Sequence, residues 1–198
     1  TTSSIWMLLA PRLVAIFRDN LANIRGLASS RTGGEHPSVY LAFWGSLVRT
    51  PISYEPVDMA GGRNVASGLL PDYLGAAGTT VSIEKILLWD PEVILVQGNY
   101  LPAERQLTIE GILRDRRLAS VRAVKSGRVY YTFGFWYWWD PALVLVESLY
   151  LSRLLYSSPV SPSDLRREGD AIFREFYGVD GAFKALCRVL ACDEWTTR

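Results

Sequence analysis

The chain has 198 residues, of which 49% are hydrophobic and 21% charged, a balance typical of a globular protein that can bury its own core. The formal net charge of +1 argues against a nucleic-acid-binding protein with a broad basic face, and we interpret the densest basic stretch, 114–128, as a solvated helix end and loop. No apolar run approaches the roughly 18 residues that cross a bilayer, and the opening Thr-Thr-Ser-Ser lacks the basic region of a signal peptide.

The first part of the chain combines one amphipathic helix with one buried strand. Apolar residues recur at helical spacing over 11–28, which predicts a helix with a single buried stripe. The run VYLAF at 39–43 follows a polar loop and predicts a short buried strand. An irregular stretch, a short helix stopped by two glycines and a turn-rich loop are expected next, over 44–54, 56–66 and 67–80.

The middle of the chain alternates helices and strands. Ser82 is a good N-cap for a helix over 82–89, and Glu84 lies in the first turn, where the helix dipole favours a negative charge. The continuous apolar run VILV at 93–96 predicts a parallel strand over 93–97 that is covered on both faces. A further helix is expected over 103–116, and a third strand over 128–132.

The last part of the chain is mostly helical. A long apolar helix begins at Pro141 and runs to residue 156, and two amphipathic helices follow near 163–177 and 180–191. Strands that alternate with helices predict a layered α/β domain whose sheet is mostly parallel.

Five aromatic residues stand in a row between the third strand and the long helix. They have no polar spacer, and neither a strand nor a helix could turn all five rings toward one core. Trp139 and Phe135 are best suited to the core, whereas Trp136, Tyr137 and Trp138 are expected to be exposed.

The sequence carries little that points to catalysis. It lacks the common nucleophile, phosphate-binding and zinc-protease motifs, and its single histidine, His36, lies in a loop before a proline. Four acidic residues near loops leave a carboxylate-based enzyme open: Asp58, Asp72, Asp90 and Asp140. Asp90 and Asp140, however, precede prolines and are typical of helix caps or turns. We therefore expect no enzyme, no cofactor and no metal site.

The two cysteines are Cys187 and Cys192. Five helical residues rise about 7.5 Å, beyond the about 7 Å that a disulfide allows between Cα atoms, so the two could bridge only if the helix ends between them. We interpret them as one core thiol and one thiol at a frayed helix end.

Three segments resemble one protein family by their order and spacing. They are AGGRNVA at 60–66, VSIEKILLWDPEVILV at 81–96, and LASVRAVKSGRVYYT at 118–132, which leads into WWDPALVLVESLYLSRLLY at 138–156. Together they resemble the C-terminal half of the periplasmic substrate-binding proteins of ABC importers, in the subgroup that handles iron–siderophore complexes, heme, cobalamin and some oxyanions. The resemblance covers about 39–156, and 11–28 match the place of the connecting helix.

The resemblance implies an architecture and a setting. Proteins of that family have two α/β lobes joined by one long helix, with the ligand between the lobes. It therefore implies a connecting helix at 1–30 and a three-layer, Rossmann-like C-terminal lobe at 31–198, with the N-terminal lobe outside this chain. It further implies a periplasmic or membrane-anchored extracellular protein whose partners are a metal-chelate ligand and the membrane permease, with no nucleic acid, and self-association of the isolated lobe through its aromatic loop.

The resemblance also implies candidate site residues. Ligands of open α/β sheets bind beyond the carboxyl ends of the strands, and this places the candidates in the loops after the first and third strands: Trp44, Arg49, Phe135, Trp136, Tyr137 and Trp138. Aromatic faces suit chelate rings and macrocycles, and an arginine suits anionic oxygens. Glu84 matches the glutamate that the family presents to the permease; the alternative is a glutamate that only complements the helix dipole.

Two other functions stay open beside the substrate-binding protein. One is an α/β enzyme with a carboxylate-based site in the same cleft. The other is a protein-interaction module whose aromatic loop meets another protein. The ordered segments place the substrate-binding protein first.

Overall fold

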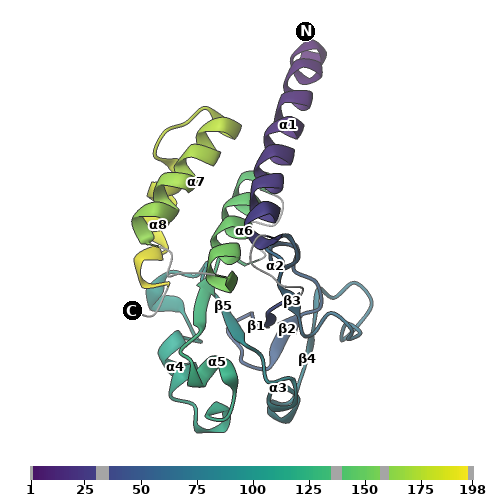
Figure 1. The fold of residues 1–198 in the computed structure, drawn as a ribbon, viewed down its shortest axis with the longest axis vertical. Helices are drawn as coiled ribbons and strands as arrows, with labels where there is room; N and C mark the ends of the chain where they lie inside the picture. The colour runs from purple at the N-terminus through teal and green to yellow at the C-terminus, as the bar shows by residue number, and fades with distance from the viewer. Residues whose placement is uncertain (1, 30–35, 135–139, 157–160, 196–198) are drawn as a thin grey trace.

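The fold is an α/β domain built on four parallel strands. The computed structural model describes residues 2–29, 36–134, 140–156 and 161–195, and the statements that follow concern these residues. The strands lie in the order β3–β1–β5–β6; their bounds are Arg63–Asn64, Ser38–Ala42, Val93–Gln97 and Val129–Thr132. Helices cover both faces of this sheet, so the predicted three-layer α/β class with a mostly parallel sheet is confirmed (Figure 1).

The two central strands form because each contains four consecutive apolar residues, with one polar residue at the start of β1 and one at the end of β5. Every residue of β1 and β5 is buried, and the strands pair in parallel from Val39 opposite Val93 to Ala42 opposite Val96. A strand buried on both faces needs such a continuous run. The three predicted strands are confirmed to within a residue or two at their ends, whereas β3 was missed because a pair of residues carries no periodic signal.

A second, two-stranded sheet lies beside the first. Strand β2 (Arg49–Pro51) pairs antiparallel with β4 (Gly78–Thr80), and β2 also contacts β1. The prediction of irregular structure over 44–54 and of a loop over 67–80 was wrong at these two strands. Three-residue strands rich in Pro, Gly and Thr show no alternation, and their pairing depends on a partner about 30 residues away.

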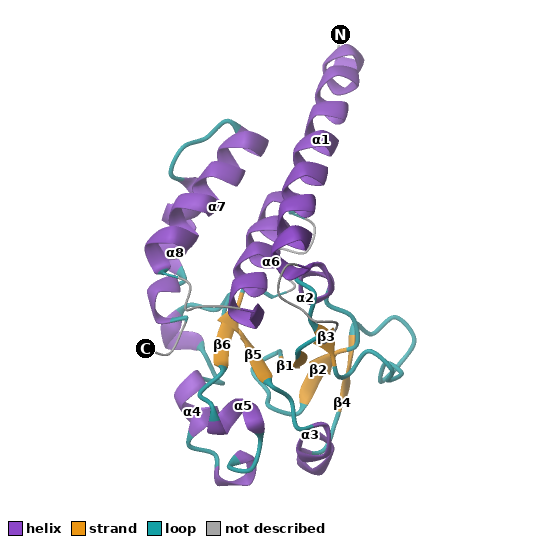
Figure 2. Cartoon of the chain, in the orientation of Figure 1, coloured by secondary structure: helices purple, strands orange, loops and turns teal. Residues whose placement is uncertain are grey.

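Helices of different length cover the two faces of the main sheet (Figure 2). Helices α2 (Glu55–Met59) and α6 (Pro141–Tyr156) pack together on one face. The opposite face carries α3 (Ile83–Trp89), α4 (Ile109–Leu113) and α5 (Arg122–Lys125). The predicted N-cap is confirmed, because the Ser82 hydroxyl accepts a hydrogen bond from the backbone N–H of Lys85 at 3.2 Å.

The helix expected over 103–116 is wrong, because the segment is broken into short turns. It contains the 3-10 turn η1 (Pro102–Glu104), then α4, then the turn η2 (Arg116–Leu118). The Thr108 hydroxyl accepts from the N–H of Gly111 at 3.0 Å, and the Asp115 carboxylate accepts from the N–H of Arg117 at 3.0 Å. Such local side-chain bonds start new turns and interrupt a continuous helix.

The long helix α1 (Thr2–Ser29) stands partly clear of the domain and contains Pro11 (Figure 1). It contacts α2, α6 and α7, where Ile24 is buried, while Val14 is exposed. None of the helices in the described ranges is long and apolar enough to cross a membrane.

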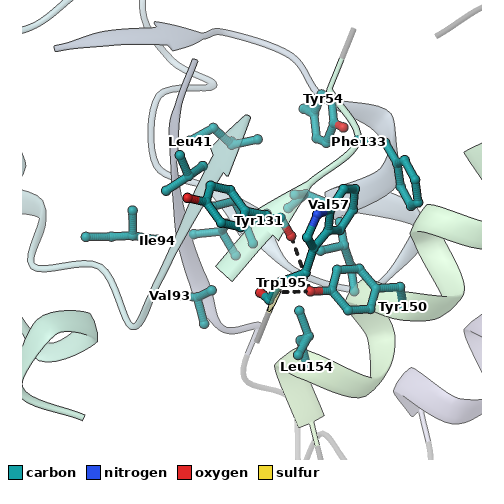
Figure 3. Packing of buried hydrophobic residues seen from close by; sticks show 14 of the residues in the cluster. Leu41, Tyr54, Val57, Val93, Ile94, Tyr131, Phe133, Tyr150, Leu154 and Trp195 are labelled. Carbon is teal, nitrogen blue, oxygen red and sulfur yellow. Dashed lines mark hydrogen bonds between the residues drawn. The ribbon is translucent and has the colours of Figure 1, made fainter. Parts of the chain in front are cut away.

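The C-terminal segment completes the core at the edge of the sheet. After α7 (Pro162–Tyr177) and α8 (Ala182–Val189), the 3-10 turn η4 (Cys192–Glu194) brings Trp195 into the core, where it is fully buried. Its carbonyl accepts from the Tyr131 N–H at 3.1 Å, and its ring lies 4.4 Å from that of Phe133 (Figure 3). The edge strand β6 is therefore covered by the end of the chain.

The cysteines flank the end of α8, and the interpretation of a frayed-end thiol is wrong. Cys187 and Cys192 are both buried. The helix ends at Val189, and Ala191 has the left-handed φ of 48° that turns the chain back. The two thiols lie within hydrogen-bonding reach of each other; burial first, and then the neighbouring Cys187 thiol, raise the pKa of Cys192.

Candidate functional site

The carboxyl ends of β1, β5 and β6 meet at one edge of the main sheet. Parallel strands point their carboxyl ends the same way, and ligands of open α/β sheets bind outside that edge. At this edge Gln97, the last residue of β5, contacts Trp44 and Gly134, and Asn99 follows two residues later in the connection that leaves β5. We call these four residues the carboxyl-edge site.

Trp44 occupies an unusual position in this site. Its φ of 55° is positive, which is uncommon for a bulky residue, and its N–H donates to Gln97 Oε1 at 2.6 Å. The ring is half-buried and packs against Gly78, where a Cβ would lie 2.6 Å from the ring. The guanidinium of Arg49 lies 5.1 Å from the ring centroid, so the structure brings together the predicted pair Trp44 and Arg49.

The amides of this site include polar atoms without partners. Gln97 is 3% exposed, and its Nε2 is buried without a hydrogen-bond partner among the described residues. Both polar side-chain atoms of Asn99 are likewise buried and unpaired within the described part of the chain. Gly134, with φ of 77°, packs so closely that a Cβ there would lie 2.8 Å from Gln97 Cγ. Buried polar groups are paired in most native proteins, so these unpaired amides call for a partner.

A buried acid and a tyrosine lie behind the site and bind the backbone of the two residues that precede the aromatic run. The Tyr54 hydroxyl donates to Glu147 Oε1 at 2.6 Å and accepts from the N–H of Gly134 at 3.0 Å. The N–H of Phe133 donates to the same Glu147 oxygen at 3.2 Å. Burial raises the pKa of Glu147 to about 8, and burial together with Glu147 raises the pKa of Tyr54 well above its usual value. The carboxyl is therefore mostly protonated at neutral pH.

The remaining predicted ligand residues, Phe135, Trp136, Tyr137 and Trp138, lie outside the described residues, and their role stays a prediction. Glu84 is exposed on the first turn of α3. Hydrogen bonds from its own N–H and from Ser82 lower its pKa, which keeps the side chain ionised. Its exposure is as expected, whereas a docking role is not tested by this geometry.

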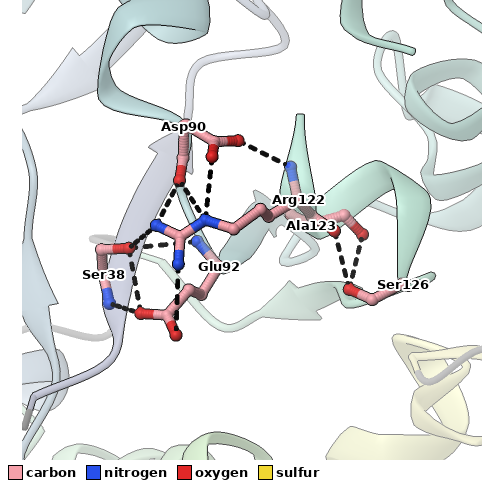
Figure 4. Close-up of polar contacts among 6 residues, drawn as sticks. All are labelled: Ser38, Asp90, Glu92, Arg122, Ala123 and Ser126. Atoms are coloured by element: carbon pink, nitrogen blue, oxygen red, sulfur yellow. Dashed lines mark hydrogen bonds and ion pairs between the residues drawn. The ribbon is translucent and has the colours of Figure 1, made fainter. Parts of the chain in front are cut away.

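The acids that left an enzyme open have structural partners. The Asp90 carboxylate accepts from the N–H of Arg122 at 2.8 Å and pairs with its guanidinium (Figure 4). Asp140 accepts from the N–H of Leu143 at 3.0 Å and so caps α6. The interpretation of these two acids as caps or turn residues is confirmed.

The other two acids and the histidine also interact with neighbouring groups among the described residues. The Asp72 carboxylate accepts a hydrogen bond from the Thr79 hydroxyl at 2.9 Å, and His36 Nδ1 lies 2.8 Å from the Gly61 carbonyl oxygen. The pKa of Asp58 is raised, first by burial and then by the neighbouring Glu55. No group of three His, Cys, Asp or Glu side chains in the described ranges could hold a metal ion.

The basic stretch at 114–128 is partly engaged in ion pairs on the opposite, amino edge of the sheet. Besides Asp90, the Arg122 guanidinium reaches Glu92 at 3.6 Å, and Glu92 accepts from the N–H of Ser38 at 2.8 Å (Figure 4). This cluster ties α5 to the starts of β1 and β5, which gives Arg122 a structural role.

Sequence reasoning missed several residues that matter here. Polar residues directly after the apolar strand β5 could have indicated Gln97 and Asn99, and a lone acid in an apolar helix could have indicated Glu147. An exposed apolar patch in the loop after β3 was also missed; its members are Leu70, Tyr73 and Leu74.

Comparisons with known proteins agree with this fold. Residues 44–133 match the family model described as periplasmic binding protein. The molybdate-binding protein MolA of Haemophilus influenzae is 29% identical over 166 residues, which are 82% of this chain and 43% of MolA.

Solved structures show the same fold. A solute-binding protein of an ABC transporter from Sulfurospirillum deleyianum superposes with a TM-score of 0.66 at 22% identity, covering 89% of this chain and 54% of that one. Helicobacter pylori CeuE in a Ni–His complex gives a TM-score of 0.64 at 16% identity, covering 89% and 55%. The chain thus spans about half the length of the proteins that it resembles.

Proposed function

We propose that this chain, which is a relative of the periplasmic binding proteins, forms one lobe of the substrate-binding component of an ABC importer. The carboxyl-edge site would be the face of the lobe that meets the ligand. The observation that carries the proposal is a fold that corresponds to about half of a solute-binding protein and leaves buried, unpaired amides at its ligand-side edge among the described residues. A ligand together with a second lobe would supply partners for those amides.

The ligand that fits best is a small metal-centred one: an iron–siderophore complex, heme, cobalamin or an oxyanion of a metal. Two relatives support this class, because their names include molybdate and Ni–His. Trp44 and Arg49 offer an aromatic face beside a cation, which suits a chelate that carries anionic oxygens. The aromatic run at 135–139 would extend that face.

The division of the chain follows from the same proposal. Residues 1–30 would form the connecting helix and 31–198 the C-terminal lobe. Exposed Glu84 would contact basic residues of the membrane permease, and the protein would work in the periplasm or on an outer surface.

A second candidate function is a protein-interaction module. It is favoured by the exposed apolar patch of Leu70, Tyr73 and Leu74, because exposed patches of this kind often meet a partner. An enzyme has weaker support, because the described acids near the loops act mainly as caps and turn residues.

The experiment is calorimetric titration of the full-length, two-lobed protein. The panel contains molybdate, ferric siderophores, heme and cobalamin. We expect one class to bind with a dissociation constant of about 1 μM or tighter, since a closed cleft buries most of a small ligand. If no class binds, and the full-length protein instead forms a stable complex that Leu74→Ser disrupts, the interaction module is the better account.

A further inference from the structure

The orientation of the Gln97 side chain is fixed by the backbone next to it. The N–H of Trp44 is a donor, so the Gln97 atom that lies 2.6 Å from it is the carbonyl oxygen Oε1. The amide nitrogen Nε2 must then carry its two hydrogens away from Trp44. Turning the amide over would set two donors against each other, and the side chain therefore cannot exchange its donor for an acceptor.

That nitrogen is a buried donor with nothing to donate to. Gln97 is 3% exposed, and its Nε2 has no partner among the described residues. Gly134 packs against the side chain on the β6 side, where a Cβ would lie 3.1 Å from Nε2. Gln97 thus lies between the connections that follow β1 and β6, which carry the predicted ligand residues.

Asn99 supplies a second amide on the same side of the chain. The N–H of Gly98 still donates to the Thr132 carbonyl at 2.7 Å, so the pairing with β6 continues past the end of β5. Residues two apart in an extended chain point to the same face, so Asn99 is expected on the same side as Gln97. Both of its polar side-chain atoms are buried and have no partner in the described ranges.

We propose that Gln97 and Asn99 donate hydrogen bonds from their side-chain amides to oxygen atoms of an anionic ligand at the carboxyl edge. The chemical class is a metal oxyanion, or a chelate whose carboxylate, catecholate or hydroxamate oxygens face the sheet. Because the Gln97 amide is held in one orientation, this position favours a ligand oxygen that can accept a hydrogen bond and disfavours an ammonium group, which can only donate. The inference rests on the proposed function of the lobe.

The test replaces the donor and keeps the acceptor. Gln97→Glu retains an oxygen for the N–H of Trp44 but presents a carboxylate to the ligand. Asn99→Asp makes the same change at a side chain that binds no other described part of the protein. Asn23→Asp is the matched control, since Asn23 is an exposed amide on helix α1 and the variant adds the same charge.

Molybdate, a ferric siderophore panel and cobalamin are titrated calorimetrically into the full-length protein and each variant. We expect an oxygen-rich anion to bind, Gln97→Glu and Asn99→Asp to weaken its binding at least about tenfold, and Asn23→Asp to change it less than about twofold. Should Gln97→Glu fail to fold, Asn99→Asp alone decides the matter.

Other outcomes overturn the inference in different ways. Binding of an anion that both variants leave within about twofold removes the two amides from the site but leaves the proposed function standing. If cobalamin is the only probe that binds, the inference about the two amides fails and the proposed function stands. If the unmodified protein binds none of the probes, the proposed function fails, and the inference fails with it.

Discussion

Replacing Glu147 with glutamine should remove most of the pH dependence of stability that this lobe shows between mildly acidic and mildly alkaline pH. The carboxyl is fully buried, and burial raises its pKa from the ordinary value of 4.5 to about 8. A raised pKa means that the folded chain holds this proton more tightly than the unfolded chain does. The stabilisation is therefore complete below about pH 4.5 and is lost as the pH rises toward 8.

The size of the effect follows from the two pKa values. Each unit of difference corresponds to about 1.4 kcal/mol, so the unmodified chain should lose about 4 to 5 kcal/mol of unfolding free energy between pH 4.5 and pH 8. The glutamine side chain of the variant would keep an oxygen for the Tyr54 hydroxyl and for the N–H of Phe133, and it cannot ionise. Glu147→Gln should match the unmodified chain at about pH 5 and exceed its stability at about pH 9.

The assay is urea unfolding followed by tryptophan fluorescence, at one-unit steps from about pH 5 to about pH 9. All other titratable groups are shared by the two proteins, so the difference between the two stability curves isolates Glu147. Parallel curves across the whole range would refute the reasoning, because they would mean that the carboxyl is not held neutral in the folded lobe.

Three further outcomes are expected. Gly169→Ala should lower the unfolding free energy by about 1–3 kcal/mol, because the added methyl group would overlap the Phe183 ring of helix α8. Gly26→Ala should raise the unfolding free energy by up to about 1 kcal/mol, because its methyl group meets nothing within 4 Å. Urea unfolding that gives equal effects for the two variants would contradict this. Oxidised glutathione should oxidise Cys187 and Cys192 of the unfolded chain to a disulfide; the two thiols lose two hydrogens and the glutathione is reduced. After refolding, the disulfide should raise the unfolding free energy of the lobe by about 2 kcal/mol. If two free thiols can still be titrated after this treatment, the prediction is wrong. Glu84→Arg should leave the melting temperature and ligand affinity nearly unchanged and impair uptake by the full-length protein, and normal uptake would remove the docking role.

The parts of the fold that the sequence predicts are those with local, repeated signals. Strands β1 and β5 each contain a run of four apolar residues, and α3 begins at a capping serine, so both kinds of element follow from neighbouring residues alone. Strands β2 and β4 depend on each other across a long separation, as in the pairing of Arg49 with Thr80. The predicted helix over 103–116 failed because Thr108 and Asp115 bind nearby backbone groups, which helical periodicity does not reveal.

The sequence also predicts some residues of the candidate site and misses others. Trp44 and Arg49 could be placed because they follow a strand in a resembling family, and the structure brings them together. The burial of Gln97 and Glu147 depends on packing between β1, β6 and α6, so composition and spacing cannot show it. An amide just after an apolar strand, and an acid within an apolar helix, are nonetheless signals that the sequence does contain.

The central claim is that the ligand binds at the carboxyl edge of this sheet. The most direct measurement is quenching of tryptophan fluorescence in the full-length protein during titration with the ligand class that calorimetry identifies. It is repeated with Trp44→Ala, with Trp136→Ala and Trp138→Ala, and with the surface control Leu88→Ala on α3. The account predicts quenching that the tryptophan substitutions weaken together with affinity in variants that still fold, while the control behaves as the unmodified protein. Unchanged affinity in all three tryptophan variants would contradict it.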